Sequence, residues 1–233
     1  MDQRDADTFI RENTALHSPP LVPELVLHLA TESLPIWRRT EDELGEAGVP
    51  PPYWAFAWAG GQALARYVLD NPELVAGRTV LDFGAGSGLV AIAAAKAGAR
   101  SVLALDIDAL ANAATKLNAA ANGVCVSVSS RDVLEEGLPE ADTLLVGDLF
   151  YERDLAESVL ELIEDAAIRG VDVLVGDPRR SYFPAERFAQ VAVYEVPVTR
   201  ELEDAEIKHT AVWQLGMPPA RHSFLAAGSV EAA

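Results

Sequence analysis

The chain has one cysteine among its 233 residues and half as many basic as acidic side chains. A single cysteine cannot form an internal disulfide, and the position of Cys125 in the strand-like stretch VCVSV predicts a buried thiol that acts as a small hydrophobic side chain. Lys and Arg total 18 against 36 for Asp and Glu, which gives a formal net charge of -18. Because that charge repels phosphate backbones, we expect no nucleic acid partner.

Long apolar runs and targeting signals are also missing. The best apolar stretch, residues 90–99, is interrupted by Lys96 and falls short of the roughly 20 residues that a membrane span needs. The first residues, MDQRDADTFI, carry three Asp, unlike a secretory signal with its basic start or an Arg-rich mitochondrial presequence. We therefore expect a cytoplasmic protein with no membrane partner.

The remaining composition is typical of a folded globular protein, with 50% hydrophobic residues, 14 Pro and 16 Gly. A chain of this length can bury one sizeable core. The pattern changes near Gly77, because Pro-punctuated segments and an acidic stretch precede it and regular strand and helix patterns follow it. We expect an N-terminal extension over residues 1–76, a core domain over 77–218 and a C-terminal tail over 219–233.

Strand-like and helix-like patterns alternate beyond Gly77. This alternation predicts right-handed βαβ units, and hence a doubly wound α/β fold with a parallel sheet covered by helices on both faces. Two strand-like runs without a full helix between them, residues 188–199 and 207–215, predict an antiparallel hairpin at one edge of the sheet. The other expected strands are residues 79–83, 101–107, 124–128, 143–147 and 171–176, and the expected helices are residues 62–69, 89–97, 110–121 and 155–168.

A glycine-rich loop follows the first of these strands. Gly84, Gly86 and Gly88 stand between the strand TVLDF and a helix, where the chain turns tightly and bare backbone N–H groups can approach a ligand. Tight turns of this kind also need glycine without any ligand. The spacing is G-x-G-x-G, and Leu89 stands where the dinucleotide fingerprint has its third glycine, which argues against NAD.

Acidic residues end the next two strands. Asp106 lies about 20 residues beyond the loop, where a carboxylate accepts hydrogen bonds from ribose hydroxyls, so the loop and Asp106 together indicate an adenosine-type ligand. Asp132, in SSRDV, follows the third strand and is suited to accept from the exocyclic amine of adenine. An exposed turn Asp would look identical in the sequence.

Asp148 ends the fourth strand, in GDLFY. In an open α/β sheet the carboxyl ends of the strands form the ligand crevice, so we expect Asp148, Phe150 and Tyr151 to point into it. The alternative role of Asp148 is N-cap of the following helix. Asp154, at the start of the helical pattern, suits that role better.

In this order, the motifs VLDFGAGSG, LALDID, SRD and LLVGDLFY resemble those of the seven-stranded, class I S-adenosylmethionine-dependent methyltransferases. Within that group, the stretches PPYWAFAWAGGQALARYVLDNP, DIDALANAATKLNAAANGV, GDLFYERDLAESV and VLVGDPRR resemble the protein lysine methyltransferases acting on the β subunit of electron transfer flavoprotein. The resemblance covers about residues 50–215. One departure is Ala59, where that family usually has Pro before the two glycines, and it affects only the rigidity of this turn.

The resemblance implies a Rossmann-like seven-stranded sheet, S-adenosylmethionine as the cofactor, and a protein substrate, either electron transfer flavoprotein β subunit or a ribosomal protein. It also implies that residues 1–76 pack on the core and on the substrate side. The D-x-x-Y element from Asp148 to Tyr151 belongs to the target-lysine site in that family, and no metal is expected. The residues expected at the cofactor are Trp58, Gly61, Asp82, Gly84, Ala85, Gly86, Gly88, Asp106, Ile107, Asp132, Val133 and Asp148. Those expected at the substrate are Trp54, Phe150 and Tyr151, and the expected catalytic residues are Asp148 and Tyr151.

An aromatic cluster ahead of the loop suits this cofactor, because an aromatic face attracts a sulfonium cation by roughly 0.5 to 2 kcal/mol per well-placed ring. Tyr53, Trp54, Phe56 and Trp58 belong to the cluster, and Trp58 next to the paired glycines is the best placed. For Trp54 and Phe56 we favour the alternative that they anchor the extension in the core.

Methyl transfer to lysine requires in-line attack by an amine whose lone pair is free. Lysine has a reference pKa of about 10.4, so a proton must leave before attack. Asp148 is better suited to accept a hydrogen bond from the amine and offset its charge than to act as the sole base. Tyr151 would orient the lysine stem or the amine.

Other classes share the cofactor half of this pattern. A methyltransferase acting on a ribosomal protein, of the L11 type, or on a small molecule is the main alternative. A nicotinamide-binding oxidoreductase would need the full dinucleotide spacing. A non-catalytic binding module would be expected to lose Asp148 or the loop glycines, and both are present.

Overall fold

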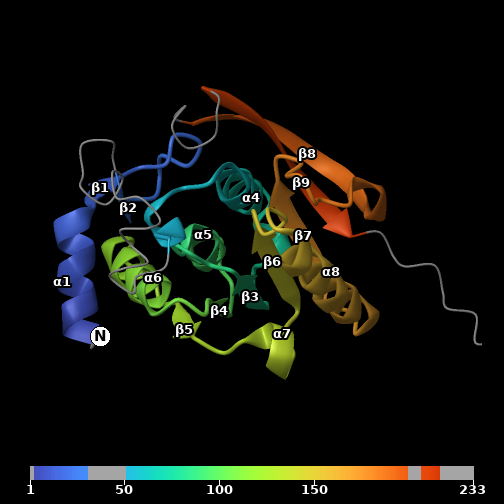
Figure 1. Ribbon diagram of the computed structural model, residues 1–233, viewed down its shortest axis with the longest axis horizontal. Coiled ribbons are helices and arrows are strands. Elements are labelled where there is room, and N and C mark those ends of the chain that lie inside the picture. Colours follow the sequence, from blue (N-terminus) through green and yellow to red (C-terminus); the bar gives the residue numbers. More distant parts are fainter. Residues whose placement is uncertain (1–2, 31–50, 199–205, 216–233) are drawn as a thin grey trace, which may run out of the picture.

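The computed structural model describes residues 3–30, 51–198 and 206–215. A seven-stranded sheet forms its centre, with the strand order β5-β4-β3-β6-β7-β9-β8 (Figure 1). The strands from β5 to β7 run parallel, and the antiparallel hairpin of β8 and β9 pairs with β7 through β9. The bounds are β3 (Thr79–Phe83), β4 (Ser101–Leu105), β5 (Ser127–Ser129), β6 (Thr143–Gly147), β7 (Asp172–Asp177), β8 (Phe188–Pro197) and β9 (Ile207–Leu215).

The order of the strands changes direction at β3. From β3 the chain continues outward to β4 and β5, and it then crosses back to place β6 on the other side of β3. Leu81 of β3 consequently lies opposite both Leu103 and Leu144. In sheets of this type ligands bind outside the carboxyl ends of the strands at such a switch point, here the ends of β3 and β6.

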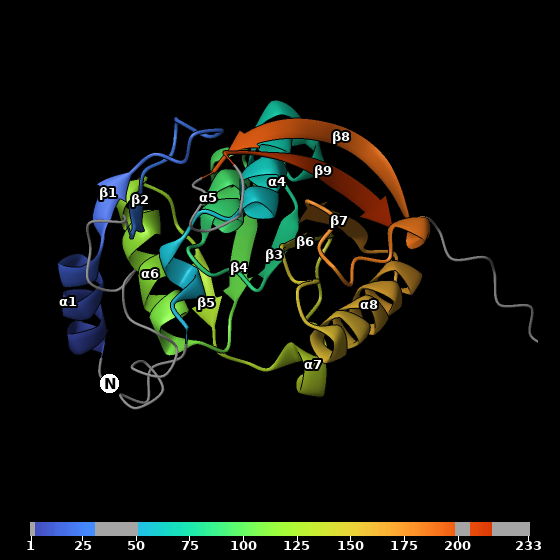
Figure 2. The ribbon, with the colours of Figure 1, turned by 45° about the horizontal axis from the view of Figure 1, so that its top comes forward.

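Alternation along the strands gives the sheet two apolar faces. Val80 packs in the core cluster that includes α4 and α5, whereas its neighbour Leu81 packs in the cluster that includes α8, because successive side chains of a strand point to opposite faces. In Figure 2, α8 lies on the opposite side of the sheet from α4 and α5. The helices are α4 (Ala59–Asp70), α5 (Leu89–Lys96), α6 (Ala109–Ala121), α7 (Val133–Glu136) and α8 (Arg153–Ile168).

The N-terminal residues pack against α6 (Figure 1). Helix α1 (Gln3–Asn13) contacts α6, and the antiparallel pair β1 (Ala15–His17) and β2 (Leu27–Leu29) follows it. Two side-chain amides at the C-terminal end of α6 hold the β2 segment, one from Asn118 within the helix and one from its C-cap residue Asn122. Asn118 Oδ1 accepts from His28 N at 2.7 Å, and the Asn122 amide both accepts from Val26 N and donates to Val26 O. These bonds satisfy backbone groups that have no strand partner on that side.

Several sequence predictions of elements are confirmed. The strands expected at residues 79–83, 143–147 and 207–215 have these bounds in the structure, and the doubly wound sheet closed by an antiparallel hairpin is present. Among the described residues no helix is both long and apolar enough to cross a membrane. The expected C-terminal tail, residues 219–233, lies outside the described residues.

Two local predictions are wrong. Cys125 is exposed rather than buried, because only Ser127–Ser129 of that edge segment pairs with β4 and Cys125 precedes the strand. Asp154 is not the N-cap of α8, since the helix begins one residue earlier and Glu152 is its N-cap, without a side-chain capping bond.

Candidate active site

The glycine-rich loop joins the end of β3 to α5. Gly84, Gly86 and Gly88 all have positive φ, of 67°, 51° and 78°, a region that favours glycine. A Cβ at Gly84 would lie 2.6 Å from the Leu149 side chain, and one at Gly88 would lie 2.8 Å from Thr115. The loop therefore needs glycine for both its backbone conformation and its packing.

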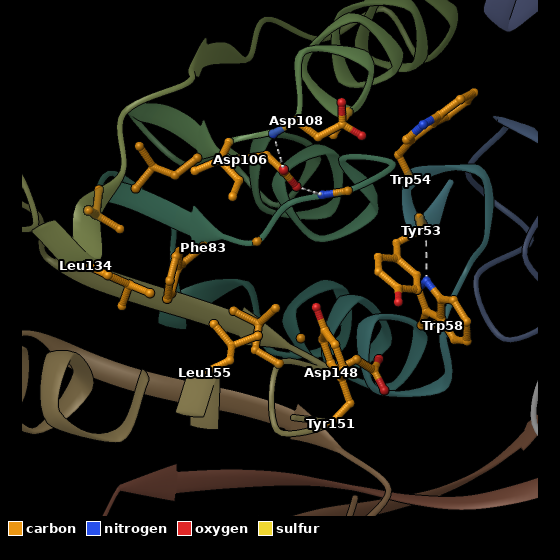
Figure 3. Close-up of a pocket in the computed structure, with 18 of the residues that line it drawn as sticks. Tyr53, Trp54, Trp58, Phe83, Asp106, Asp108, Leu134, Asp148, Tyr151 and Leu155 are labelled. Atoms are coloured by element: carbon orange, nitrogen blue, oxygen red, sulfur yellow. Dashed lines mark hydrogen bonds between the residues drawn. The ribbon is translucent and has the colours of Figure 1, made fainter. Parts of the chain in front are cut away.

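Asp106 fixes this loop from the end of β4. One carboxylate oxygen accepts from Gly86 N at 2.9 Å, and the other accepts from Asp108 N at 2.9 Å (Figure 3). Burial raises the pKa of Asp106, and these two backbone bonds act in the opposite direction. Each carboxylate oxygen has further lone pairs, so Asp106 can still accept hydrogen bonds from ligand hydroxyls.

The loop and the ends of β4 and β6 enclose one continuous cavity of about 460 Å³. This volume lies within the roughly 300–1,000 Å³ of small-molecule and cofactor sites, and the walls are mostly apolar with a few polar groups, as such sites are. Its lining residues are Pro51, Tyr53, Trp54, Trp58, Phe83, Gly84, Gly86, Leu105, Asp106, Ile107, Asp108, Ala111, Arg131, Asp132, Val133, Leu134, Gly147, Asp148, Leu149, Tyr151, Leu155 and Arg180.

The donor and acceptor set of the cavity fits a nucleoside cofactor. Three carboxylates, Asp106, Asp108 and Asp132, line it near the apolar side chains of Ile107 and Val133. Carboxylates accept from hydroxyl and amine groups, and apolar side chains cover the faces of a base. In the described residues no three His, Cys, Asp or Glu side chains gather in a way that could hold a metal.

Asp148 lies at the other end of the cavity (Figure 3). Its φ of 59° is rare for a residue other than glycine, and Asp is among those that tolerate it. Oδ2 accepts from Gly61 N at 2.8 Å, while Oδ1 accepts from Arg180 Nε at 2.9 Å and Nη2 at 2.6 Å. Asp148 as a whole is only 7% exposed, and these bonds fix the orientation of its carboxylate.

A second buried acid lies beside this pair. Asp177 ends β7, is fully buried, and accepts through Oδ1 from Arg180 N at 2.7 Å. Among the described residues its Oδ2 has no hydrogen-bond partner. Burial, followed by the charge of Asp148, raises the pKa of Asp177 to about 7. Two carboxylates and one guanidinium thus meet at the ends of β6 and β7.

The aromatic residues Tyr53, Trp58 and Tyr151 lie around Asp148 and form an aromatic rim of the cavity (Figure 3). The Tyr53 and Tyr151 ring centroids lie 5.7 Å apart, and both residues remain more than 40% exposed. Trp58 donates from Nε1 to Tyr53 O at 2.9 Å, and the Arg180 guanidinium lies 5.5 Å from the centroid of its ring. Burial raises the pKa of Tyr151, so its hydroxyl stays a hydrogen-bond donor at neutral pH.

Most residues expected at the site line the cavity, and some do not. The Trp54 ring is buried among α1 and α6, so Trp54 both bounds the cavity and anchors the extension. The lining positions among the predicted ones are Trp54, Trp58, Gly84, Gly86, Asp106, Ile107, Asp132, Val133, Asp148 and Tyr151, and the predicted positions outside the lining are Gly61, Asp82, Ala85, Gly88 and Phe150.

Two of the outlying positions have clear structural roles. Asp82 shares the strand face of Val80, so it lies beneath α5 and accepts from Ala91 N at 2.8 Å. The expectation that Phe150 faces the crevice is wrong: it is fully buried and packs edge to face on Phe183 at 5.2 Å. Gly61 acts on the site indirectly, because its N–H holds Asp148.

The sequence interpretation missed Asp108, Asp177 and Arg180. Asp108 is the N-cap of α6, where its side chain accepts from Leu110 N, and it also lines the cavity. Asp177 and Arg180 belong to the stretch GDPRR after β7. The signal that could have revealed them is the position of that stretch at the carboxyl end of a strand next to β6.

Known proteins with similar sequences and folds are methyltransferases. The chain is 36% identical over 212 residues to the electron transfer flavoprotein beta subunit lysine methyltransferase of Rattus norvegicus, a match spanning 88% of this chain and 82% of the relative. It is 37% identical over 225 residues to the protein of the same name from Danio rerio, spanning 92% of this chain and 85% of that one. The family profile of ribosomal protein L11 methyltransferase (PrmA) matches residues 62–170.

The fold has counterparts among solved structures. Magnesium protoporphyrin IX methyltransferase (ChlM) from Synechocystis PCC 6803, with bound SAM, aligns with a TM-score of 0.50 at 18% identity, covering 67% of this chain and 78% of that one. At this level of identity the likeness concerns the fold alone, which is that of the class I methyltransferases.

Proposed function

Because the chain belongs to the family of electron transfer flavoprotein β-subunit lysine methyltransferases, we propose that it methylates a lysine of the electron transfer flavoprotein β subunit, using S-adenosylmethionine. The observation that carries this proposal is the single cavity that joins an acid-lined glycine loop to Asp148 and its aromatic rim. One end suits the cofactor, and the other suits a lysine side chain.

The residues of the first end suit an adenosine-type cofactor. Asp106 would accept from the ribose hydroxyls, and the apolar Ile107 and Val133 would flank the base near Asp132. Asp132 also caps α7 by accepting from Leu134 N at 3.0 Å, so it is held in place. When bound, S-adenosylmethionine supplies an electrophilic methyl group on a sulfonium.

The residues of the second end suit a lysine side chain. Tyr53, Trp58 and Tyr151 form an aromatic rim, in which Tyr53 and Tyr151 remain partly exposed. Aromatic faces of this kind attract a cation and exclude water from it. Asp148 would accept a hydrogen bond from the amine. One of its oxygens already accepts from Gly61 and the other from Arg180. This supports a role in aligning the amine more than a role in removing its proton.

The charge of the chain agrees with a target that presents lysine. A formal net charge of -18 favours encounter with a basic surface and disfavours phosphate-rich partners. This supports a protein substrate without identifying it.

A methyltransferase of the ribosomal protein L11 type is the second candidate. The profile of that family matches residues 62–170, which carry the glycine loop, Asp106 and Asp148. The match ends before β7 and therefore omits Asp177 and Arg180. By contrast, the flavoprotein-directed relatives match over 88% and 92% of the chain.

The test is methyl transfer from labelled S-adenosylmethionine to purified electron transfer flavoprotein β subunit, with purified ribosomal protein L11 offered in parallel. We expect label on lysine of the flavoprotein subunit only, mapped by mass spectrometry, and much less label with an Asp106→Ala control at the same, subsaturating cofactor concentration. Label on L11 alone would favour the second candidate. Label on neither protein would contradict the proposal.

A further inference from the structure

The carboxylate of Asp148 is paired with a cation that belongs to the same chain. Arg180 donates to Oδ1 from both Nε and Nη2, and its own backbone N is held by Asp177 Oδ1. Side-chain exposures of 17% for Arg180 and 8% for Asp148 mean that little water screens the pair. The guanidinium also lies over the Trp58 ring, so both Asp148 and Trp58 hold it in place.

This pairing matters for the chemistry of an amine acceptor. An ammonium group has no lone pair and cannot attack, and a carboxylate within a few ångströms of an amine favours the ammonium form. An unpaired Asp148 would therefore bind the target lysine well and keep it unreactive. A guanidinium on the same carboxylate opposes that effect, because it balances the charge that would hold the proton.

Among the residues that the structure describes, the other ionisable groups around the pair do not supply this balance. Asp177 adds a carboxylate at the end of β7, and Tyr151 and Tyr53 add neutral hydroxyls at the rim. Asp106 lies across the cavity after β4, and Glu152 follows Tyr151. Arg131 lies at the end of the cavity near Asp132 and pairs with Glu136. Among the described residues lining the Asp148 end, Arg180 supplies the cation.

We propose that Arg180 is a positioning residue that holds Asp148 through Oδ1 and balances its charge, so that the acceptor lysine is bound as the neutral, reactive amine. This inference rests on the proposed function, since it requires a lysine acceptor. Arg180 acts through Asp148. The lysine gives up its proton to solvent before attack. The nitrogen lone pair would then form the bond to the methyl carbon as the methyl–sulfur bond breaks, and S-adenosylhomocysteine would leave.

The test is the pH dependence of kcat, which reports groups in the enzyme–substrate complex. Arg180→Gln removes the balancing cation, so we expect the rising limb of the profile to move to higher pH by about one unit or more. Arg180→Lys keeps a cation and should stay closer to the parent. Arg179→Gln is the matched control, because it removes the same positive charge from the neighbouring residue. The Arg179 side chain is exposed, stacks on Trp213 and does not line the cavity.

A second readout does not depend on turnover. A flavoprotein β subunit carrying a ¹³C-monomethylated target lysine is bound to each variant with S-adenosylhomocysteine, and the ¹³C shift is titrated. We expect the pKa of the bound amine to be higher with Arg180→Gln than with the parent or with Arg179→Gln. With Asp148→Asn we expect the pKa of the bound amine to be lower than with the parent, because the positive charge of Arg180 is then no longer balanced. The rising limb of the kcat profile should accordingly move to lower pH, although transfer by this variant is slow.

The outcomes separate the inference from the function on which it rests. If the parent methylates the flavoprotein subunit and Arg180→Gln is slower by the same factor at every pH, Arg180 is a structural residue and the inference is wrong. If Arg180→Gln does not fold, Asp148→Asn decides instead. A rising limb of its kcat profile at the parental pH would overturn the inference. A parent that does not methylate the subunit contradicts the proposed function and this inference with it.

Discussion

Single residues at the two ends of the cavity use the same chemical group in different ways. Asp106 accepts from two backbone N–H groups and so ties the glycine loop to the end of β4. Asp148 accepts from one backbone N–H and from a guanidinium, so its charge is already balanced before a substrate arrives. The first arrangement leaves acceptor capacity for neutral hydroxyls. Under the proposed function, the second would set the charge that an amine acceptor meets.

Replacing Asp106 by Ala should weaken cofactor binding. The change leaves the ligand hydroxyls without an acceptor in the complex, which costs roughly 1–3 kcal/mol for a buried unsatisfied group. It also removes the two backbone bonds that tie the glycine loop to the end of β4. We expect Asp106→Ala to raise the Kd for S-adenosylhomocysteine by about tenfold to a hundredfold in calorimetry. A folded variant that binds with parental affinity would exclude Asp106 from the cofactor site.

Replacing Asp148 by Asn should affect transfer more than binding. The substitution keeps the shape and an acceptor oxygen but removes the charge that aligns the amine and pairs with Arg180. Loss of one preorganised electrostatic contact typically costs about 10²-fold or more in rate, so single-turnover transfer at saturating cofactor should fall by that order. Transfer close to the parental rate, in a variant with a parental melting curve, would mean that Asp148 is structural.

At the scale of elements, the site depends on how closely α4 approaches β7. A Cβ at Gly60 would lie 2.2 Å from Gly176 O and 2.5 Å from Asp148 Oδ2, and a Cβ at Gly176 would lie 2.1 Å from Gly60 O. These contacts leave no room for a side chain at either Gly60 or Gly176. The close approach is what brings Gly61 N within hydrogen-bond distance of Asp148.

Gly60→Ala should therefore displace Asp148. It should also lower the free energy of unfolding by about 1–3 kcal/mol, as is usual for overpacking. Gly61→Ala is the matched control one residue along the same helix, because its Cβ would meet nothing closer than 3.9 Å and the backbone N–H is retained. Melting temperatures of the two variants measure the difference. Equal melting temperatures would show that α4 can move away from β7 without cost.

At the scale of the whole molecule, buried acids make stability depend on pH. Burial raises the pKa of Asp82 to about 7, and the nearby charge of Asp106 adds to that effect. The raised pKa means that the folded protein keeps a proton that the unfolded chain releases above about pH 4. The stability contributed by Asp82 is thus fully present below that pH and is lost as the pH rises through about 7.

We expect the melting temperature to fall between pH 5 and pH 8, and Asp82→Asn to reduce that fall. Asparagine does not titrate in this range and can still accept from Ala91 N. The pH-dependent loss of unfolding free energy that the substitution removes should therefore be on the order of 4 kcal/mol at most. Asp154→Asn, on the exposed first turn of α8, is the control and should leave the fall unchanged. A parental pH dependence in Asp82→Asn would assign the effect to other groups, such as Asp177.

The sequence by itself determined most of the strands and helices beyond Gly77 and the glycine-loop end of the cavity. Strand and helix periodicities, the glycine loop and an acid after the second strand are local patterns within a few tens of residues, and the strands at residues 79–83, 143–147 and 207–215 follow from them. Gly84, Gly86 and Asp106 line the cavity as expected for the same reason.

Only the tertiary structure decided which residues meet at the amine end. Asp148, Gly61, Asp177 and Arg180 come from the ends of β6 and β7 and from α4, and their contacts follow from the pairing of β6 with β7 and the packing of α4 on both. The sequence did not determine whether a given side chain is buried or exposed either. Phe150 is buried in the core rather than facing the cavity, and Cys125 is exposed rather than buried. Partners separated by 32 or 87 positions leave no periodicity in a single sequence, since their proximity is fixed by long-range packing.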